Sequence, residues 1–150
     1  MKSRSLKGFT KQWSKHLGVL TLLVAGMGGS HLAADILTAA RPSIDMRVHK
    51  DYGLPELPDI AERLIIASSY SGNTEETLSA IDAAKKIEAK IIGVTTGGKI
   101  AELIKSGEIA GTIIDPGVTN PTNFPKTGLG VSFGALSGTL AKIGILKRLK

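Results

Sequence analysis

Apolar runs alternate with longer mixed stretches along most of the chain, and this alternation predicts a series of strands and helices. The first run, VLTLLVA at residues 19–25, is unbroken, which is typical of a strand buried on both faces. Shorter runs predict further strands at residues 44–49, 63–69, 90–96 and 111–115. The mixed stretches predict helices at residues 30–40, about 74–88, 99–106 and about 129–145. Strands that alternate with helices build a parallel sheet, so the expected fold is α/β.

Two of the predicted helices carry informative spacings. In the helix at about 74–88, one apolar face is expected from residues spaced three apart, namely Leu78, Ile81, Ala84 and Ile87. The last helix carries Gly130, Gly134 and Gly138 at four-residue spacing. Because glycine weakens a helix, such a row predicts close approach by another element, either the sheet or a second subunit.

Composition narrows the class of protein. A chain of 150 residues, 42% hydrophobic and 21% charged, is expected to form one globular domain over residues 1–150. It has no cysteine, and its three histidines lack the spacing of metal ligands, so neither a metal nor a cofactor is expected.

The net charge of +6 is unevenly distributed. Residues 1–16 form a basic N-terminal extension with five basic residues and no acidic one, and residues 142–150 add four more. Residues 17–141 therefore hold ten basic against 13 acidic residues, a balance of −3. This body does not resemble a nucleic-acid surface, and solvated ends explain the basic termini better than an anionic partner does.

Two apolar stretches imitate membrane or export signals. LGVLTLLVAGMGG at residues 17–29 follows a basic stretch, as in a signal peptide, but it runs directly into a glycine motif that cleavage would destroy. Residues 127–141 are uncharged, yet they are too short and too rich in Gly, Ser and Thr to span a bilayer. The sequence therefore predicts a cytoplasmic protein without a membrane partner.

The loop GMGGS at residues 26–30 follows the first strand and precedes a helix. It is explained equally well as a tight turn with Ser30 as helix cap or as a contact to phosphate or sugar. Gly26-x-Gly28 also begins a dinucleotide-binding fingerprint, but His31 occupies the third glycine position, and only Asp51 offers a ribose-binding acid. Nucleotide binding is therefore a weak alternative.

The most hydroxyl-rich stretch is SSYSGNTEET at residues 68–77, between the third strand and the next helix. A helix N-terminus presents unpaired N–H groups and partial positive charge, so added hydroxyls make a phosphate site. Ser69, Ser71 and Thr74 are the expected donors, with Gly72 allowing the turn. The alternative is a helix cap formed by Asn73 or Thr74, with Glu75 and Glu76 complementing the helix dipole. These acids also disfavour a phosphate very close to them.

The third loop, TTGGK at residues 95–99, follows the fourth strand. A turn that starts a helix explains it slightly better than a part in a ligand pocket does.

Together these motifs resemble the sugar isomerase (SIS) domain family. SSYSGNTEET is similar to the family signature Ser-x-Ser-Gly-x-Thr-x-Glu-Thr, and AGMGGSHLAADIL, DYGLPE and TTGGKI extend the resemblance over most of residues 19–145. The segment looks most like the N-terminal half of bifunctional phosphoglucose/phosphomannose isomerases.

The resemblance implies a three-layer αβα sandwich with a five-stranded parallel sheet of flavodoxin-like order. It implies that a sugar phosphate is held by Ser30, Ser69, Ser71 and Thr74. The pocket backbone would come from Gly28, Gly29, Tyr70, Gly72 and Asn73, and TTGGK would become part of the pocket wall. A homodimer or a partner SIS domain is also expected.

The implied reaction converts glucose 6-phosphate or mannose 6-phosphate into fructose 6-phosphate. This chemistry needs a base that moves a proton between C2 and C1 and a donor for the developing oxyanion. In the family, the base and an important histidine lie in a second half, and this chain has no Asp or Glu after Asp115. The family's proline-arginine pair is Pro125-Lys126 here, which keeps the charge but loses the guanidinium fork.

Three residues remain as catalytic candidates, each with a plainer explanation. Lys126 replaces the family arginine. His31 is placed to aid ring opening or contact phosphate, although a partly exposed histidine at a helix start explains it slightly better. Glu76 is the best internal base by position, but pairing with the helix dipole explains it too. The alternative function is therefore a sugar-phosphate-binding sensor or regulatory module without catalysis.

Overall fold

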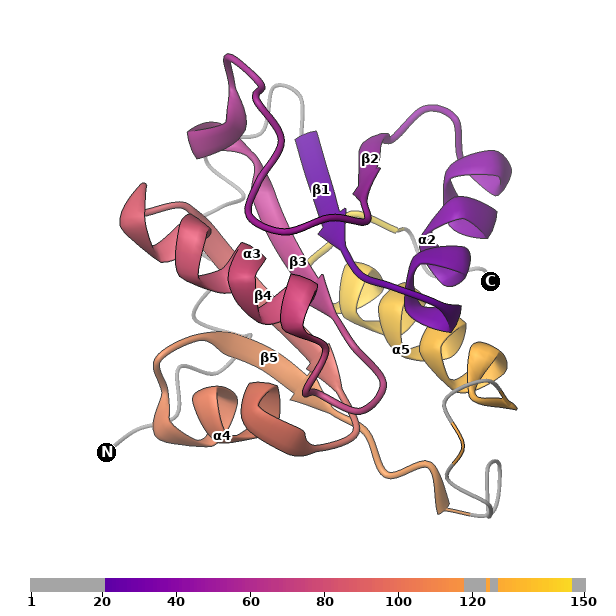
Figure 1. Ribbon diagram of the computed structural model, residues 1–150. Helices are drawn as coiled ribbons and strands as arrows, with labels where there is room; N and C mark the ends of the chain where they lie inside the picture. The colour runs from indigo at the N-terminus through magenta and orange to yellow at the C-terminus, as the bar shows by residue number, and fades with distance from the viewer. Residues whose placement is uncertain (1–20, 118–123, 125–126, 147–150) are drawn as a thin grey trace.

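A computed structural model of the chain describes residues 21–117, 124 and 127–146. The strands are β1 (Thr21–Ala25), β2 (Asp45–His49), β3 (Leu64–Ser68), β4 (Lys90–Thr95) and β5 (Ala110–Ile113). The helices are α2 (Gly29–Ala40), α3 (Glu75–Lys86), α4 (Gly98–Ser106) and α5 (Leu129–Lys142), with a 3₁₀ turn η1 (Ile60–Glu62) (Figure 1). Every predicted strand and helix is present within a few residues, whereas η1 was not predicted. The basic extension at residues 1–16 lies outside the described residues.

The five strands form one parallel sheet in the order β2-β1-β3-β4-β5. This is the flavodoxin-like order, and it confirms the expected α/β fold. The chain leaves β1 for the edge strand β2 and then returns through β3 to build the other side of the sheet. The order therefore reverses next to β1, where doubly wound folds bind their ligands.

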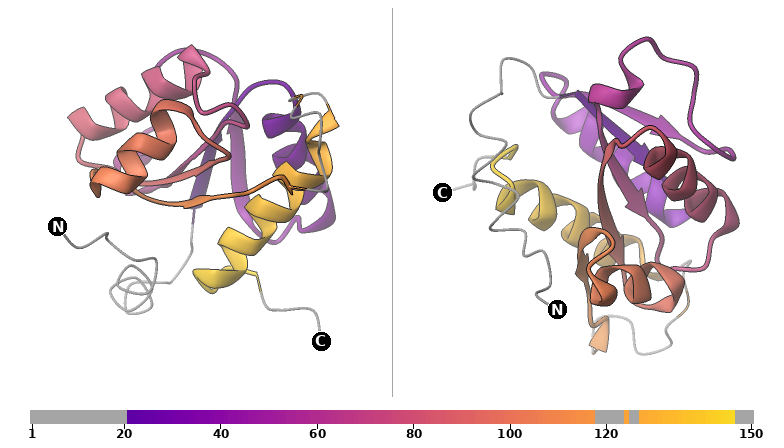
Figure 2. Two further views of the ribbon diagram at one scale, coloured as in Figure 1. Left: turned by 90° about the horizontal axis from the view of Figure 1, so that it is seen from below. Right: turned by 90° about the vertical axis from the view of Figure 1, so that its left-hand side faces the viewer.

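Two layers of helices cover the two faces of the sheet (Figure 2). Because side chains alternate along a strand, each central strand contributes to two cores. On one face, strand residues such as Val24 and Ile66 pack with Leu37 of α2 and Leu136 of α5. On the other face, α3 and α4 cover alternate strand residues, and the buried members of this core include Leu23, Ile65, Ala67, Ile81 and Ile100. The expected three-layer sandwich is confirmed.

The predicted apolar face of α3 is largely correct. Ile81 and Ala84 are fully buried, and Leu78 is partly buried against the same core. Ile87, however, is 40% exposed, because α3 ends at Lys86 and Ile87 is its C-cap. The three-residue spacing of apolar residues therefore continues one position beyond the end of α3.

The glycine row on α5 does not contact the sheet. Gly130, Gly134 and Gly138 are all exposed, and a Cβ added at any of them would meet no atom within 4 Å. The buried side of the same helix is formed by Ser132, Leu136, Thr139 and Leu140. The sheet is thus excluded as the close neighbour of these glycines.

A buried arginine joins three segments at the amino-terminal edge of the sheet. The side chain of Arg63 is 4% exposed, and it forms ion pairs with Asp59 at 2.9 Å and Asp45 at 3.3 Å. Its Nη1 also donates to the carbonyl oxygen of Leu22 at 3.3 Å. Arg63 therefore links the start of β2, the turn η1 and strand β1, on the opposite edge from the loops described next.

Candidate functional site

Three loops meet at the carboxyl edge of the sheet because β1, β3 and β4 all point the same way. Residues 26–28 lead from β1 into α2, residues 69–74 lead from β3 into α3, and residues 96–97 lead from β4 into α4. Three helices therefore begin at this edge, each with first-turn N–H groups that no carbonyl of the same helix can accept. Their aligned dipoles make the edge favourable for an anion.

Tyr70 ties these loops together through its backbone. Its N–H donates to Ser30 Oγ at 3.2 Å. Its carbonyl oxygen accepts from the N–H of Thr96 at 3.1 Å and from Thr96 Oγ1 at 2.6 Å. Its ring lies against Gly128, the N-cap of α5, where any Cβ would collide with the ring carbons. Tyr70 thus connects the β1, β3 and β4 loops with the start of α5.

In the serine loop, residues 68–74, two of the predicted phosphate donors are paired. Ser69 Oγ is 2.7 Å from Thr74 Oγ1, and it accepts from the N–H of Gly72 at 3.0 Å. Ser71 Oγ accepts from the N–H of Asn73 at 3.3 Å. Ser69 is buried, Thr74 is half-buried and Ser71 is exposed. All three predicted phosphate donors therefore lie in the loop that leads into α3, with Ser69 and Thr74 in direct contact.

The predicted role of Gly72 in the turn is confirmed. Its φ of 73° lies in the left-handed region, and a Cβ would overlap the carbonyl oxygen of Gly97. The carbonyl oxygen of Gly72 accepts from the N–H of Ile100 at 3.1 Å, and Asn73 Oδ1 accepts from the N–H of Lys99 at 3.0 Å. The TTGGK stretch is thus both the predicted turn before a helix and a wall beside the serine loop.

Side-chain capping does not account for the hydroxyls at these helix starts. The N-cap of α2 is Gly28, and Ser30 lies inside the helix with its Oγ accepting from Tyr70. Thr74 occupies the N-cap position of α3 but makes no side-chain capping bond, since its Oγ1 is paired with Ser69. Of the residues predicted as caps, Thr74 does occupy the N-cap position of α3, whereas Ser30 and Asn73 are not the N-caps of α2 and α3, and none of the three makes a side-chain capping bond to its own helix.

The two glycines of the first loop that were predicted to form pocket backbone, Gly28 and Gly29, occupy different positions relative to α2. Gly28 has a φ of 57°, which favours glycine, and a Cβ there would meet open space. Gly29 is the first residue of α2. Ser30, predicted to contact phosphate, is 3% exposed and fastens the loop to Tyr70, so its contact with a ligand remains a prediction.

Two of the three candidate catalytic residues lie on different helices of the described structure. His31 lies in the first turn of α2, with Nδ1 2.9 Å from Asp35 Oδ2. Glu76 is half-buried in the first turn of α3. Its neighbour Glu75 accepts a 3.1 Å hydrogen bond from the hydroxyl of Tyr52, and this bond raises the pKa of Tyr52. Lys126 lies outside the described residues.

Sequence reasoning missed the connections between loops. The Tyr70–Ser30 and Tyr70–Thr96 bonds join residues 40 and 26 positions apart, and no local sequence pattern predicts them. The His31–Asp35 bond did have a signal, because residues four apart face one another on a helix.

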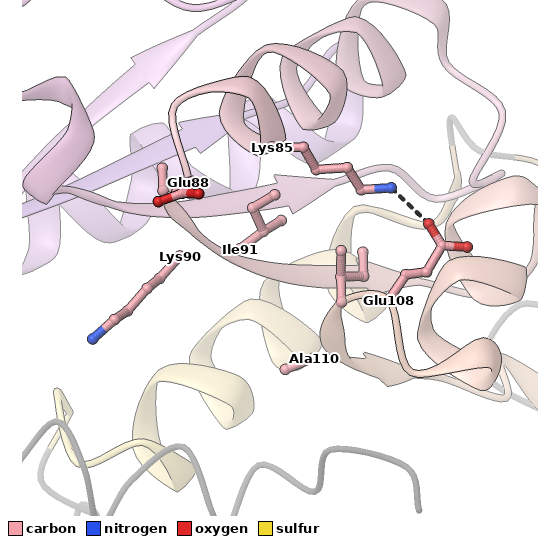
Figure 3. Close-up of a pocket in the computed structure, with 8 residues that line it drawn as sticks. Lys85, Glu88, Lys90, Ile91, Glu108 and Ala110 are labelled. Carbon is pink, nitrogen blue, oxygen red and sulfur yellow. Dashed lines mark hydrogen bonds and ion pairs between the residues drawn. The ribbon is translucent and has the colours of Figure 1, made fainter. Parts of the chain in front are cut away.

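Two pockets lie away from this edge. One, of about 310 Å³, lies at the amino ends of β4 and β5 beside the 2.8 Å ion pair of Lys85 and Glu108 (Figure 3). The other, of about 450 Å³, lies between α3 and α4, with Leu78 and Leu103 among its lining residues. None of the predicted site residues lines either pocket. The described segments hold no cluster of three or more His, Asp or Glu side chains that could bind a metal ion. They also contain no helix long and apolar enough to cross a membrane.

Comparison with known proteins identifies the family. No family model matches the chain. A bifunctional phosphoglucose/phosphomannose isomerase from Caldicellulosiruptor bescii is 39% identical over 129 residues, which cover 84% of this chain and 36% of the relative. A protein of the same name from Aeropyrum pernix is 32% identical over 138 residues, covering 88% of this chain and 41% of the relative. The chain belongs to the sugar isomerase (SIS) domain family. This SIS domain spans less than half the length of these two curated relatives.

Solved structures agree on the fold. A Methanococcus jannaschii protein with an inferred function of 3-hexulose-6-phosphate isomerase has a TM-score of 0.61 at 19% identity, over 92% of this chain and 75% of that one. The Vibrio vulnificus NanR protein, solved in complex with ManNAc-6P, has a TM-score of 0.50 at 15% identity, over 89% of this chain and 54% of that one. At these identities the likeness concerns the fold of the SIS domain.

Proposed function

We propose that this SIS domain binds the phosphate of a hexose 6-phosphate and forms part of an isomerase site that interconverts glucose 6-phosphate or mannose 6-phosphate with fructose 6-phosphate. The observation that carries the proposal is the serine loop. Ser69, Ser71 and Thr74 all lie in the loop that leads into α3, Ser69 and Thr74 are in contact, and none of the three makes a side-chain capping bond to the helix. The identity with bifunctional phosphoglucose/phosphomannose isomerases supports the choice of substrate.

The phosphate would be held by hydroxyl and backbone donors. Hydrogen bonds to a charged acceptor are shorter and stronger than neutral ones, so a few donors suffice to fix a dianion. Within the loop, Ser69 Oγ pairs with Thr74 Oγ1 and accepts from the N–H of Gly72, and Ser71 Oγ accepts from the N–H of Asn73. A phosphate would replace some of these weak local bonds with charge-assisted ones. The serine loop is therefore pre-organised by the same groups that would bind the ligand.

Completion of the isomerase site would need a second SIS domain or subunit. The proton transfer between C2 and C1 requires a base within hydrogen-bond reach of both carbons. On this chain, Glu75 is engaged by Tyr52, which leaves Glu76 as the internal candidate. Lys126 would stabilise the oxyanion, and His31 would assist ring opening. The greater length of the relatives supports a base supplied from outside this segment.

The pairing surface would include the outer side of α5. Its exposed glycines, Gly130, Gly134 and Gly138, leave room for a second helix to approach closely. The exposed side chains of the neighbouring helix α2 include Leu32 and Ile36, at 43% and 42%. The glycines of α5 and these apolar side chains of α2 suit a second copy of the domain or a partner SIS domain.

A second candidate function is sugar-phosphate sensing without turnover. It is favoured by the fold shared with the NanR protein that was solved with ManNAc-6P. The serine loop would act in the same way, but no base would be required.

The test is calorimetric titration of the 150-residue chain with glucose 6-phosphate, alongside a coupled assay for fructose 6-phosphate. Binding with turnover is expected if the chain pairs with itself and provides a base. Binding without turnover would favour the sensing function, or an isomerase that needs a different partner. If the chain bound none of glucose, mannose and fructose 6-phosphates, both the isomerase and the sensing function would be contradicted.

A further inference from the structure

A histidine and an aspartate are paired on the helix that begins beside the serine loop. The two residues lie one turn apart on α2, and the distance from His31 Nδ1 to Asp35 Oδ2 is 2.9 Å. The side chain of His31 is 25% exposed, and that of Asp35 is 41% exposed. A second element reaches the same carboxylate, because Lys50, directly after β2, places its Nζ 3.4 Å from Asp35 Oδ2.

The chemistry of the pair fixes the position of a proton. An ionised carboxylate only accepts hydrogen bonds, so the atom that faces it, Nδ1, must carry the hydrogen. In a neutral imidazole the other nitrogen, Nε2, then carries the lone pair and can act as a base.

Asp35 is suited to remain ionised at neutral pH. Its slight burial alone would raise the pKa, but the hydrogen bonds from His31 and Lys50 outweigh that effect and lower the pKa of Asp35 below its ordinary value of 3.8. The carboxylate thus keeps its acceptor role over the whole range in which imidazole is neutral.

The pair lies close to the loops of the site. His31 directly follows Ser30, whose Oγ accepts from the N–H of Tyr70 in the serine loop. On the other side, the carbonyl oxygen of His49 accepts from the N–H of Gly26 at 3.1 Å, which brings the end of β2 and Lys50 to the same loop. The pair is therefore anchored by two strands at the edge where the hexose phosphate is proposed to bind.

We propose that Asp35 is a positioning residue that holds His31 with its proton on Nδ1, so that Nε2 serves as the base for opening the hexose ring. The proposal rests on the proposed function, because it assumes that a hexose 6-phosphate binds at this edge. During ring opening, Nε2 takes the proton of the C1 hydroxyl, the C1–O5 bond breaks as the C1 carbonyl forms, and the imidazolium returns the proton to O5. No net proton or electron is gained or lost.

Ring opening can be measured separately from isomerisation. Interchange of the α and β anomers of glucose 6-phosphate requires opening and closing of the ring but no base at C2. Magnetisation exchange between the anomer signals in NMR therefore reports this step on the 150-residue chain, whether or not a partner supplies the isomerisation base. The tautomer of His31 is read from the nitrogen shifts of its ring, at about pH 8.5 where an ordinary imidazole is neutral.

Four variants isolate the pair. Asp35→Ala removes the acceptor at a helical position that alanine suits. Asp35→Glu keeps an ionised carboxylate, which can only accept from Nδ1–H, so it tests rescue. His31→Ala removes the base. Asp82→Ala is the matched control, because Asp82 is an exposed helical aspartate on α3, across the sheet.

The expected results differ between positioning and mere surface pairing. The unmodified chain should show the Nδ1–H tautomer and accelerate anomer exchange. Asp35→Ala should shift the tautomer towards Nε2–H and slow the exchange at least tenfold, within the roughly 10²–10⁴-fold that general acid–base groups contribute. Asp35→Glu should restore much of the tautomer, and Asp82→Ala should change neither quantity.

Four outcomes would overturn the inference. An Nε2–H tautomer in the unmodified chain would refute the positioning, with or without a ligand. Normal exchange in Asp35→Ala, despite an altered tautomer, would make the bond a helix-surface pair only. Lack of any calorimetric binding of glucose 6-phosphate would remove the ring-opening role together with the proposed function, whereas binding with no accelerated exchange would remove the ring-opening role alone.

Discussion

Ser69 and Ser71 show how two similar side chains in one loop perform different tasks. Ser69 is 2% exposed, and its hydroxyl accepts from the N–H of Gly72 and pairs with Thr74. Ser71 is exposed, and its Oγ accepts a hydrogen bond from the N–H of Asn73. At 3.3 Å, this contact is long. Ser69 therefore maintains the shape of the loop, while Ser71 is the more accessible donor.

This difference predicts separate effects of alanine substitution. Ser71→Ala should weaken hexose 6-phosphate binding by about 1–3 kcal/mol, because a charged acceptor loses a donor, and should leave the free energy of unfolding nearly unchanged. Ser69→Ala should weaken binding similarly and also lower the free energy of unfolding by about 1–3 kcal/mol, because the buried N–H of Gly72 loses its acceptor. Calorimetry and urea denaturation measure the two quantities. Equal binding by both variants and the unmodified chain would rule out the serine loop as the phosphate site.

The sheet has two edges with different contents, the proposed binding loops at one and a buried ion-pair cluster at the other. At the carboxyl edge, the loops are joined by hydrogen bonds through Tyr70. At the amino-terminal edge, Arg63 joins β1, β2 and η1 through Asp59, Asp45 and Leu22. The hydrogen bond from Arg63 lowers the pKa of Asp59 below its ordinary value of 3.8. A cluster that depends on an ionised carboxylate ties part of the stability to pH.

The Arg63 cluster predicts a specific acid response. Because the folded-state pKa of Asp59 is depressed, its contribution to stability is present above pH 3.8 and is lost as pH falls through the lower folded-state pKa. Urea denaturation at a series of pH values should show this loss in the unmodified chain. Arg63→Met, which fills the buried space without a charge, should reduce the acid-dependent part of the loss.

Arg41→Met is the matched control for that experiment, because Arg41 is exposed at the end of α2. It should leave the acid response intact. If Arg63→Met and the unmodified chain lose the same free energy between neutral pH and acid, the ion pairs of Arg63 contribute nothing that depends on pH.

The SIS domain as a whole has one helix whose outer side is unusually bare. Gly130, Gly134 and Gly138 are exposed on α5, and no Cβ added there would meet another atom. In an isolated domain such glycines only cost helix stability. Their placement is explained if another domain packs against α5, as we propose for the paired protein.

The glycines predict opposite effects on folding and on pairing. Gly134→Ala should raise the free energy of unfolding of the monomer by about 0.5–1 kcal/mol, because alanine loses less backbone entropy in a helix. Gly134→Leu should weaken self-association, since its larger side chain would occupy the proposed contact. Sedimentation velocity over a range of concentrations measures the pairing. Asp82→Leu, which adds the same side chain on α3, should pair normally, and unaltered pairing of Gly134→Leu would place the interface elsewhere.

The elements of this fold could be predicted well because their signals are local. The unbroken apolar run before Gly26 predicted β1, and the alternation of strands with helices predicted a parallel sheet. The flavodoxin-like strand order came from resemblance rather than from any single segment. The failures were also local in origin. Regular spacing extended the apolar face of α3 to Ile87, although the helix ends one residue earlier.

By itself, the sequence determined the strands, the helices and the hydroxyls placed at the start of α3, because hydrophobic periodicity and helix-start chemistry act over a few residues. Tertiary structure alone decided that Tyr70 joins distant loops, that Ser30 fastens one of them, and that the glycines of α5 face away from the sheet. These contacts depend on strands far apart in the chain ending at a common edge. A side chain's neighbours there follow from the packing of whole elements, which no short stretch of sequence records.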